Sequence, residues 1–360
     1  MKSIIRRDTK TIFVGKVQIG GNASISVQTM TKTDTRDHET TLREIKRLHI
    51  AKCDIIRLAV PDMEAAKALE RIAPFSPIPV IADIHFDHHL ALQAIVSGVH
   101  GLRINPGNLR EQNKIKEIAK AARDRKIPIR IGVNAGSLDP ALVATHGGVT
   151  AKALAESALR EVALLEKAGF EDIKIAVKTF NIDMMIEAVK IVAAACNYPL
   201  HLGVTESGLP QEGIVRSSIG IGALLLQGIG DTIRVSLTGD SAEEVAVGIR
   251  ILKCLGCREQ GPTIISCPTC GRCQIPLQEI ASEVSKRISD ISLPLQIAVM
   301  GCAVNGPGEA RQADFGIAGG KESGLIFRKG KVVKTLPASE LVEGLLDEIN
   351  RYLASNHNNK

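Results

Sequence analysis

Cysteines gather in one part of the chain, with a spacing that suits metal binding. The segment SCPTCGRC, residues 266–273, holds three of the eight cysteines, and six of the eight lie between residues 254 and 302. Cysteine pairs separated by two residues are common ligands of zinc and of iron–sulfur clusters. The first residues, MKSIIRRDTK, lack the apolar stretch of a signal peptide. The sequence therefore predicts a metal site in a cytoplasmic protein rather than a disulfide framework.

Two sets of four ligands are compatible with this spacing. In the first, the pair Cys254 and Cys257 joins Cys267 and Cys270, as in a zinc ribbon. Cys254 lies in VGIRILKCLG, a segment of helical apolar period in which a buried thiol is expected, so this set is the less favoured alternative. In the second set, Cys267 and Cys270 join the distant Cys302, and the fourth position is open or taken by a ligand other than sulfur.

Residues 300–310, MGCAVNGPGEA, favour the second set. Cys302 follows a predicted strand and precedes Asn-Gly-Pro-Gly, a turn that can direct backbone amides toward a cluster's sulfurs. Glu309 lies just beyond that turn and can reach back to the metal. A carboxylate beside three thiolates is a weakly held ligand, so such an iron can exchange it for substrate, whereas an all-cysteine cluster mainly transfers electrons. Cys273 is then a spare thiol that packs next to the site.

A second group of reactive residues lies on predicted strands earlier in the chain. Strand side chains alternate between two faces, and in PIRIGVN, residues 128–134, the aliphatic residues share one face while Arg130 and Asn134 share the other. The same alternation places one cation opposite the apolar face of each of five strands: Arg57, Arg103, Arg130, Lys178 and Arg234. Inward cations are costly without an anion, and Asp83 and Glu206 are the obvious inward carboxylates. The pattern predicts a site for a multiply charged anion such as phosphate or diphosphate.

The elements that must position these residues repeat in a regular order. From about residue 22 to residue 255, eight β-branched runs each precede a segment of helical period. Eight βα units predict an α/β fold, a TIM (β/α)8 barrel, whose sites form at the C-terminal ends of the strands. The segment TIFVGKVQIGGN predicts a β-hairpin at about residues 10–21 that plugs the opposite end. Polar residues end nearly every strand: Asp83, His85, Asn105, Asn134, Lys178, Thr205, Glu206, Ser236 and Thr238.

The pattern changes after Gly256, and we place a domain boundary there, with a barrel over residues 1–258 and a small α+β domain over residues 259–360. The second domain is predicted to contain a helix at residues 276–289, strands at 295–300 and 315–320, a hairpin at 324–336 and a final helix at 339–354. In the barrel, the long loop at residues 135–148 is expected to act as a flap. Five loop or core residues are expected to be structural, as solvated or capping histidines or as buried thiols: His88, His89, His146, Cys53 and Cys196.

The composition of the chain limits the kinds of ligand that it is expected to bind. The formal net charge is +6, but aromatic residues make up only 2% of the chain and Trp is absent, so the stacking surfaces used by nucleic-acid-binding proteins are scarce. The basic residues are dispersed, and no run of eighteen apolar residues predicts a membrane span. The charge therefore favours a small anionic molecule rather than nucleic acid or a membrane.

Seven segments carry a resemblance to a known family: SCPTCGR, MGCAVNGPGEA, ADFGIAGG, GLRINPGN, IRIGVNAGS, GVTESG and GIGDTIRVSLTGD. Together they closely resemble the bacterial 4-hydroxy-3-methylbut-2-enyl diphosphate synthases, in their two-domain form, over nearly the whole chain. The resemblance implies reductive ring opening and dehydration of 2-C-methyl-D-erythritol 2,4-cyclodiphosphate, in isoprenoid biosynthesis by the methylerythritol phosphate pathway. The segment KTFNIDMM around Lys178 fits the family less closely than its neighbours.

The resemblance also implies the roles of individual residues. A [4Fe–4S] cluster would be held by Cys267, Cys270, Cys302 and Glu309. The substrate would be bound by Arg57, Asp83, His85, Arg103, Arg130, Asn134, Lys178, Thr205, Arg234 and Ser236. Glu206 would transfer a proton, as loss of a hydroxyl as water requires a proton donor, with an ion pair to a barrel arginine as its structural alternative. Asn305 would position the substrate beside the cluster, which makes Glu206, Asn305 and Glu309 the implied catalytic residues.

Partners follow from the same resemblance. Flavodoxin or ferredoxin would supply electrons, and relatives form homodimers in which the cluster domain of one subunit caps the barrel of the other. Two alternatives of other classes remain: a zinc-ribbon protein that binds nucleic acid, and a non-redox phosphosugar barrel enzyme with a structural metal domain. A brown, oxygen-sensitive protein would exclude zinc, and reductant-dependent turnover would exclude the non-redox enzyme.

Overall fold

The computed structural model of the chain describes residues 4–85, 87–104, 112–259, 261–302, 308 and 310–357. Three residues of the predicted site, Asn105, Asn305 and Glu309, lie outside these ranges. The chain forms two compact units, Met1–Arg258 and Glu259–Lys360, each of which is described by itself. None of the described helices combines the length and apolar character needed to cross a bilayer.

The first unit is an eight-stranded parallel barrel. Its strands follow one another around the sheet in the order β8-β7-β6-β5-β4-β3-β10-β9, and a bridge between Ile175 and Leu200 joins the two ends. The predicted (β/α)8 fold is therefore confirmed. The strands are β3 (Ser26–Met30), β4 (Ile55–Ala59), β5 (Val80–Asp83), β6 (Gly101–Ile104), β7 (Ile129–Asn134), β8 (Ile173–Lys178), β9 (His201–Leu202) and β10 (Thr232–Ile233).

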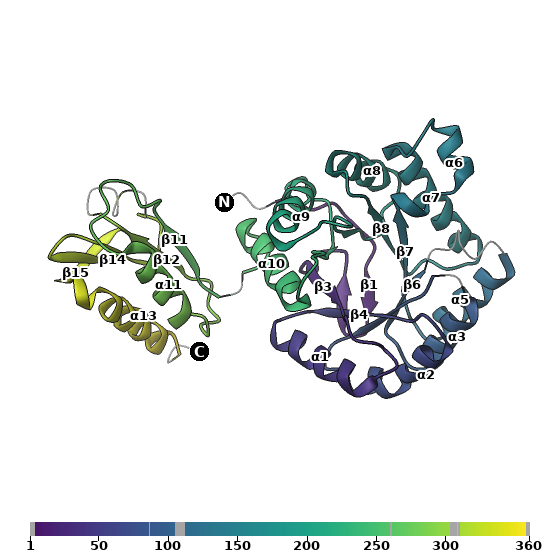
Figure 1. Cartoon of the computed structure of the whole chain (residues 1–360), viewed down its shortest axis with the longest axis horizontal. Helices are drawn as coiled ribbons and strands as arrows, with labels where there is room; N and C mark the ends of the chain where they lie inside the picture. Colours follow the sequence, from purple (N-terminus) through teal and green to yellow (C-terminus); the bar gives the residue numbers. More distant parts are fainter. Residues whose placement is uncertain are drawn as a thin grey trace. The chain divides into compact units, whose positions relative to one another are not determined.

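Helices surround the strands (Figure 1). The aliphatic faces of the strands pack against them in one large core that includes Val27, Ile56, Ile129 and Ile175. Aspartate, threonine or asparagine side chains cap most of these helices by accepting hydrogen bonds from first-turn amides, which stabilises the helix starts. The helices are α1 (His38–Ile50), α2 (Met63–Ile72), α3 (His88–Val96), α5 (Gln112–Asp124), α7 (Ala151–Lys167), α8 (Ile182–Ala195), α9 (Pro210–Leu225) and α10 (Ser241–Cys254).

The N-terminal hairpin closes one end of the barrel. It consists of β1 (Ile12–Val14) and β2 (Val17–Ile19), which pair antiparallel around Gly15, whose φ of 56° suits glycine. Side chains of both strands pack against Ile55 and Ile81 in a small separate core. Because those two residues lie at the starts of β4 and β5, the hairpin covers the N-terminal ends of the strands.

Short helical pieces fill two connections. One is the 3-10 helix η1 (Ala73–Phe75). The others are η2 (Ala135–Ser137) and α6 (Pro140–Thr145), which occupy the segment expected to be an open loop. Asp139 caps α6, and His146 at its end forms an ion pair with Glu156 of α7 at 2.7 Å. The segment after β7 is thus partly helical and tied to the barrel wall.

The second unit is a mixed sheet with helices on one face. Its strand order is β11-β12-β13-β14-β15, in which β11, β12 and β13 are parallel and the remaining pairs antiparallel. Helices α11 and α13 cover the face that presents Ile297, Val299 and Ile317, while Ala310 and Ala313 pack on the other face. The elements are β11 (Thr263–Ser266), α11 (Leu277–Arg287), β12 (Gln296–Met300), β13 (Phe315–Ala318), β14 (Ser323–Arg328), β15 (Lys331–Pro337), η3 (Ala338–Glu340) and α13 (Leu341–His357).

Three details differ from the sequence-based expectations. Strand β11 was not predicted, because its four residues follow Gly-Pro and are exposed or half-buried, so they carry no clear alternation. Cys254, expected to be buried, is exposed at the last position of α10, whose buried side presents Ile251 and Leu252 instead. Cys53 is buried as expected, whereas Cys196 is only half-buried.

Candidate active site

A polar cavity of about 190 Å³ opens at the C-terminal ends of the barrel strands. Ten of its lining residues are those predicted to bind substrate: Arg57, Asp83, His85, Arg103, Arg130, Asn134, Lys178, Thr205, Arg234 and Ser236. They come from strands or strand ends spread around the barrel. The structure therefore brings together in one cavity every barrel residue to which a substrate contact was assigned.

Asp83 holds two of the arginines in place. Its carboxylate lies 3.5 Å from Arg57 Nε and 3.1 Å from Arg103 Nη1, and Arg103 Nη1 also lies 2.9 Å from a ring nitrogen of His85. Burial acts to raise the pKa of Asp83, but Arg57, the hydrogen bond with His85 and Arg103 outweigh it and hold that pKa far below its usual range. Asp83 is therefore a permanent anion that orients cations.

A second carboxylate, Glu244 of α10, performs the same task for Arg234. The two side chains are 3.6 Å apart, and Glu244 also accepts hydrogen bonds from Thr29 and from the backbone N–H of Leu237. Sequence reasoning missed Glu244, although it lies on the buried side of α10 beside Val245 and Gly248. The sequence feature that could have indicated its buried role is the position of a glutamate within the apolar stripe of a helix.

Arg130 and Lys178 lack such a partner among the residues that the structure describes. They are 3% and 7% exposed, and neither forms an ion pair there. Burial, followed by the charges of Arg57 and Arg103, lowers the pKa of Arg130 well below its ordinary value. Burial likewise lowers the pKa of Arg57, to about 10. The cavity thus carries more positive charge than its carboxylates neutralise, which favours an anionic ligand.

Two glycines make room for the cations. A Cβ atom at Gly132 would lie 2.6 Å from Arg103 Nε, and one at Gly203 would lie 2.8 Å from Lys178 Nζ and 2.5 Å from the backbone oxygen of Arg234. Sequence reasoning missed both glycines. Gly132 lies on the same strand face as Arg130 and Asn134. A glycine between two inward polar residues was therefore the sequence feature that could have indicated this space.

Glu206 does not point inward as expected. It is exposed, it does not line the cavity, and its φ of 56° is unusual for a residue other than glycine. Strand β9 ends at Leu202, so the two-residue alternation that predicted an inward side chain no longer applies at Glu206. Its position is instead on the segment that follows β9, close in sequence to the lining residue Thr205.

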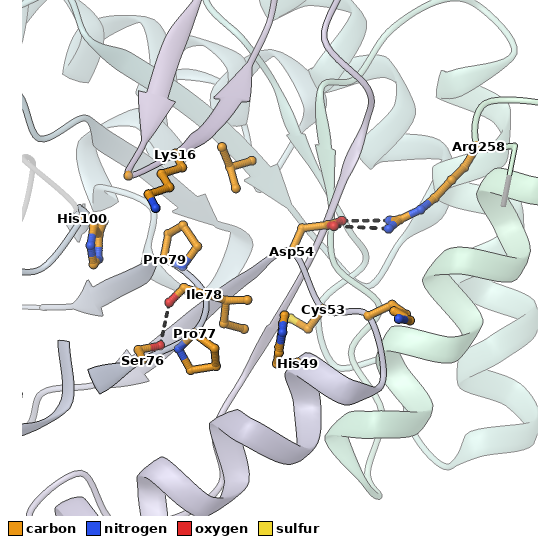
Figure 2. A pocket seen from close by; sticks show the side chains of 13 residues that line it. Lys16, His49, Cys53, Asp54, Ser76, Pro77, Ile78, Pro79, His100 and Arg258 are labelled. Carbon is orange, nitrogen blue, oxygen red and sulfur yellow. Dashed lines mark hydrogen bonds and ion pairs between the residues drawn. The ribbon is translucent and has the colours of Figure 1, made fainter. Parts of the chain in front are cut away.

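A larger cavity, of about 400 Å³, lies at the opposite end of the barrel (Figure 2). It is bordered by Lys16 of the hairpin, His49 of α1 and the connections that precede β4, β5 and β6. Its one carboxylate, Asp54, is paired with Arg258 at 2.8 Å. None of the predicted site residues that the structure describes lines it. Chemistry, rather than volume, identifies the smaller cavity as the candidate site.

The loop histidines His88, His89 and His146 do not line the cavity. Asp87 caps α3 by accepting a hydrogen bond from the N–H of His89. Ligand atoms of Asp87, His88 and His89 lie within 4.8 Å of one another, but the three residues are consecutive and occupy a helix start, which accounts for the grouping. His146 pairs with Glu156, as noted above.

Two cysteines of the second unit, Cys267 and Cys273, lie against Gly301, which directly precedes Cys302. The N–H of Gly301 is 3.3 Å from Cys267 Sγ, and a Cβ atom at position 301 would lie 2.5 Å from Cys273 Sγ. Cys302 is buried, Cys267 is half-buried and Cys270 is exposed. Hydrogen bonding with the backbone and side chain of Arg272 lowers the pKa of Cys270 and so favours its thiolate, which is the form that binds metal.

This donor set is compatible with an iron–sulfur cluster. Among the described residues, no three cysteine sulfurs lie within 4.8 Å of one another, as the ligands of one tetrahedral zinc would. Cysteines that bind different irons of one cluster lie farther apart, and backbone N–H groups directed at sulfur are typical of such sites. Cys257, part of the alternative zinc set, packs against the barrel core instead.

Comparisons with known proteins agree along the whole chain. Residues 9–249 match the family model described as the GcpE TIM-barrel domain, and residues 263–351 match the GcpE protein C-terminal domain. A 4-hydroxy-3-methylbut-2-en-1-yl diphosphate synthase (flavodoxin) from Clostridium tetani is 55% identical over 96% of this chain and 99% of its own length. Synthases of the same name from Thermodesulfovibrio yellowstonii and Geobacter sulfurreducens are 52% and 51% identical, over 97% and 98% of this chain and 100% of their own.

Solved structures confirm the barrel alone. Dihydropteroate synthase from Yersinia pestis superposes with a TM-score of 0.51 at 12% identity, covering 68% of this chain and 98% of that protein. The corresponding enzyme from Stenotrophomonas maltophilia gives a TM-score of 0.50 at 14% identity, covering 68% and 97%. At such low identity the likeness concerns the fold.

Proposed function

The chain belongs to the GcpE family, and from that premise we propose that it is the oxidoreductase that converts 2-C-methyl-D-erythritol 2,4-cyclodiphosphate to 4-hydroxy-3-methylbut-2-enyl diphosphate. The observation that carries this proposal is the barrel cavity, in which Arg130 and Lys178 are buried without a carboxylate partner among the described residues. A diphosphate supplies the negative charge that Arg130 lacks, and it stabilises the ammonium form of Lys178. The relatives that share half or more of the sequence carry the name of this synthase.

The barrel unit binds the diphosphate in this proposal. Arg57, Arg103 and Arg234 are already oriented by Asp83 and Glu244, so their donors need little rearrangement when the anion enters. Such preorganised charge stabilises the negative charge that develops as the ring opens. The remaining substrate contacts are assigned to His85, Arg130, Asn134, Lys178, Thr205 and Ser236, all of which line the cavity.

Two groups are assigned to the chemical step. Glu206 donates the proton that leaves with the hydroxyl as water, from a position beside the cavity-lining Thr205. Glu206 is exposed and has a left-handed backbone conformation on the segment that follows β9. Asn305, which lies outside the described residues, is assigned to orienting the substrate.

The second unit holds the redox cofactor. We assign Cys267, Cys270 and Cys302 as ligands of a [4Fe–4S] cluster, with Glu309, which lies outside the described residues, as the fourth. When bound, such a cluster supplies electrons one at a time and offers an iron that acts as a Lewis acid. The residues around it have simpler tasks: Gly301 donates its N–H toward Cys267, and Arg272 favours the thiolate of Cys270.

Electrons come from flavodoxin in this proposal, because the names of the most similar relatives specify it; ferredoxin is the second candidate. We place the protein in the cytoplasm. All eight cysteines are free thiols, as expected in a reducing compartment.

We also propose a homodimer in which the barrel of one subunit works with the cysteine unit of its partner. Helix α9 and its C-cap expose Val215, Ile219 and Leu226 at helical spacing, and a side chain at Gly222, on the same stripe, would meet open space. An exposed apolar stripe of this kind is typical of a protein–protein interface. The Ile219→Glu variant is expected to sediment as a monomer; unchanged sedimentation would exclude this surface.

Turnover under anaerobic conditions tests the proposed function. Full-length protein reconstituted with iron and sulfide is expected to convert the cyclodiphosphate to the linear product when reduced flavodoxin is supplied, followed by phosphorus NMR. Turnover without a reductant would favour a non-redox barrel enzyme, and a colourless protein that retains zinc would favour the zinc-ribbon alternative.

A further inference from the structure

A buried histidine lies directly beneath the candidate site. His201, the first residue of β9, is completely buried, and its Nε2 is 3.3 Å from Lys178 Nζ. Its other ring nitrogen, Nδ1, is hydrogen-bonded to the hydroxyl of Thr232 on the neighbouring strand β10. Lys178 lines the cavity, whereas His201 and Thr232 do not. The three side chains thus run from the cavity wall into the barrel interior.

The chain of contacts can hold its proton in two ways, both of which keep the contacts of His201 with Lys178 and Thr232. If Lys178 is a cation, it donates to His201 Nε2, and His201 Nδ1–H donates to the Thr232 hydroxyl. If Lys178 is a neutral amine, His201 Nε2–H donates to it, and the Thr232 hydroxyl donates to Nδ1. A hydroxyl can donate or accept, and a neutral imidazole has two tautomers. Burial, followed by the charge of Lys178, lowers the pKa of His201 far below its usual range, so the ring stays neutral.

The surroundings decide which arrangement holds. The charged or titratable groups that influence Lys178 are Arg57, Arg103, Arg130, Lys174, His201 and Arg234, with Asp83 and Glu244 as the nearby buried carboxylates. Burial, followed by Arg130 and Arg234, lowers the pKa of Lys178 well below its ordinary value. An anion of several charges in the cavity acts in the opposite direction, because it stabilises the ammonium form.

Backbone geometry reserves the space that this contact needs. Gly203, which directly follows β9, lies so close to Lys178 that a Cβ atom there would come within 2.8 Å of its Nζ. The absence of a side chain at Gly203 therefore leaves the space that the lysine head occupies beside His201.

We propose that Lys178, His201 and Thr232 form a proton-accepting unit through which the cavity takes up one proton from solvent for each diphosphate that it binds. In the empty site Lys178 is a neutral amine that accepts from His201. When the diphosphate enters, Lys178 Nζ gains a proton and donates to both the anion and His201 Nε2, and His201 changes tautomer. His201 and Thr232 are positioning residues in this scheme. The inference rests on the proposed function, which supplies the diphosphate.

Calorimetric titration of the full chain with inorganic pyrophosphate, repeated from pH 7 to 9, tests this coupling. Proton uptake on binding makes the affinity for pyrophosphate fall as pH rises. A plot of log Kd against pH should therefore have a slope that is larger by about one for the wild type than for Lys178→Met. The protonation of pyrophosphate itself contributes equally to both slopes, so it cancels in their difference. In the wild type, histidine nitrogen NMR should show His201 Nε2 protonated in the empty site and Nδ1 protonated in the complex; His201→Gln assigns the signal.

Lys190→Met is the control, because Lys190 is exposed on α8 and does not line the cavity. It should retain the wild-type slope. Burial lowers the pKa of Lys174 to about 7, so Lys174→Met is measured as well, to separate any proton that this second buried amine takes up. Thr232→Val, which lacks the hydroxyl that donates to Nδ1, should lose the change of tautomer. Equal slopes in the wild type and Lys178→Met, as great a loss of slope in Lys174→Met as in Lys178→Met, or an unchanged tautomer switch in Thr232→Val would each overturn the inference, while bound pyrophosphate would leave the proposed function standing. Failure of pyrophosphate to bind at all would overturn both.

Discussion

The two units of the chain prepare for their ligands in different ways. The barrel builds a rigid, buried site from strand residues and leaves it with excess positive charge, so its interior is complete except for an anion. The second unit places its thiols on loops that precede α11 and follow β12, where one of them, Cys270, is exposed. Strands position donors accurately without a ligand, whereas loop thiols become fixed when a metal links them.

The stability of each unit should reflect this difference. Burying Arg130 without a carboxylate partner among the described residues destabilises the empty barrel, and that energy is recovered when an anion binds. The second unit has its own core between its sheet and two helices, so it can fold around the cysteines without strain of that kind.

Removal of a single proposed cluster ligand should abolish turnover. In Cys270→Ser the iron content and the visible absorption of anaerobically reconstituted protein should fall, and kcat should drop more than about 1,000-fold, because the redox centre is lost. Cys273→Ser is the matched control in the same loop: Cys273 bonds to the backbone oxygen of Ile275, a contact that serine can keep. Full iron content and activity in Cys270→Ser would contradict the ligand assignment.

A barrel cation should show opposite effects on function and stability. Arg130→Met is expected to lower kcat/KM about 100-fold or more, because it removes charge-assisted hydrogen bonds to the diphosphate. The same change should raise the free energy of unfolding of the empty protein by about 1–3 kcal/mol, measured by urea denaturation, since a buried unpaired charge disappears. The control Arg287→Met, at an exposed ion pair, should leave activity unchanged. A destabilised Arg130→Met would contradict the strain assigned to the barrel.

Removing the charge of Asp83 should destabilise the protein, which is the opposite of the stability effect expected for Arg130→Met. Asp83→Asn is expected to lose about 2–4 kcal/mol of stability, because Arg57 and Arg103 are left without compensation. The pKa of Asp83 is lowered on folding, so its contribution is fully present above the unfolded-state pKa of about 4 and is lost as pH falls below it. The stability difference between wild type and variant should stay constant from pH 8 to 5 and shrink in more acidic solution. A difference that persists undiminished at acid pH would show that charge is not the cause.

The smallest effect concerns space rather than charge. Gly203→Ala introduces a Cβ atom against Lys178 and the backbone of Arg234, which should cost about 1–3 kcal/mol through local displacement and weaken pyrophosphate binding about 10-fold. Gly136→Ala is the control, because a Cβ atom there meets open space. If both variants bind pyrophosphate as the wild type does, the close contact at Gly203 has no functional consequence.

The contrast between the units also explains what the sequence could predict. The eight barrel strands and the inward cations Arg57, Arg103 and Arg130 follow from period-two alternation, which a buried parallel strand must keep. Glu206 was expected to point inward because alternation was extended past Leu202, where β9 has already ended. Exposed Cys254 shows the same limit at a helix end, where apolar periodicity no longer decides burial.

Other features depend on contacts that no local pattern contains. Glu244 belongs to α10 yet holds Arg234, and His201 supports Lys178 from the next strand. Each pairing joins different elements of the barrel and is set by tertiary packing. In the second unit, the spacing of Cys267 and Cys270 indicated metal, but the role of Gly301 as an amide donor to Cys267 is evident only from the fold.

The central claim is that the barrel cavity is a site for the substrate's diphosphate, and binding without turnover tests it most directly. Calorimetric titration of the cyclodiphosphate onto the full chain, with no reductant present, isolates the barrel from the redox chemistry. We predict saturable binding of one molecule per chain, weakened by added salt as charge-based recognition requires and reduced about 100-fold or more in Arg130→Met. Absence of binding, or equal affinity in the wild type and Arg130→Met, would contradict the account.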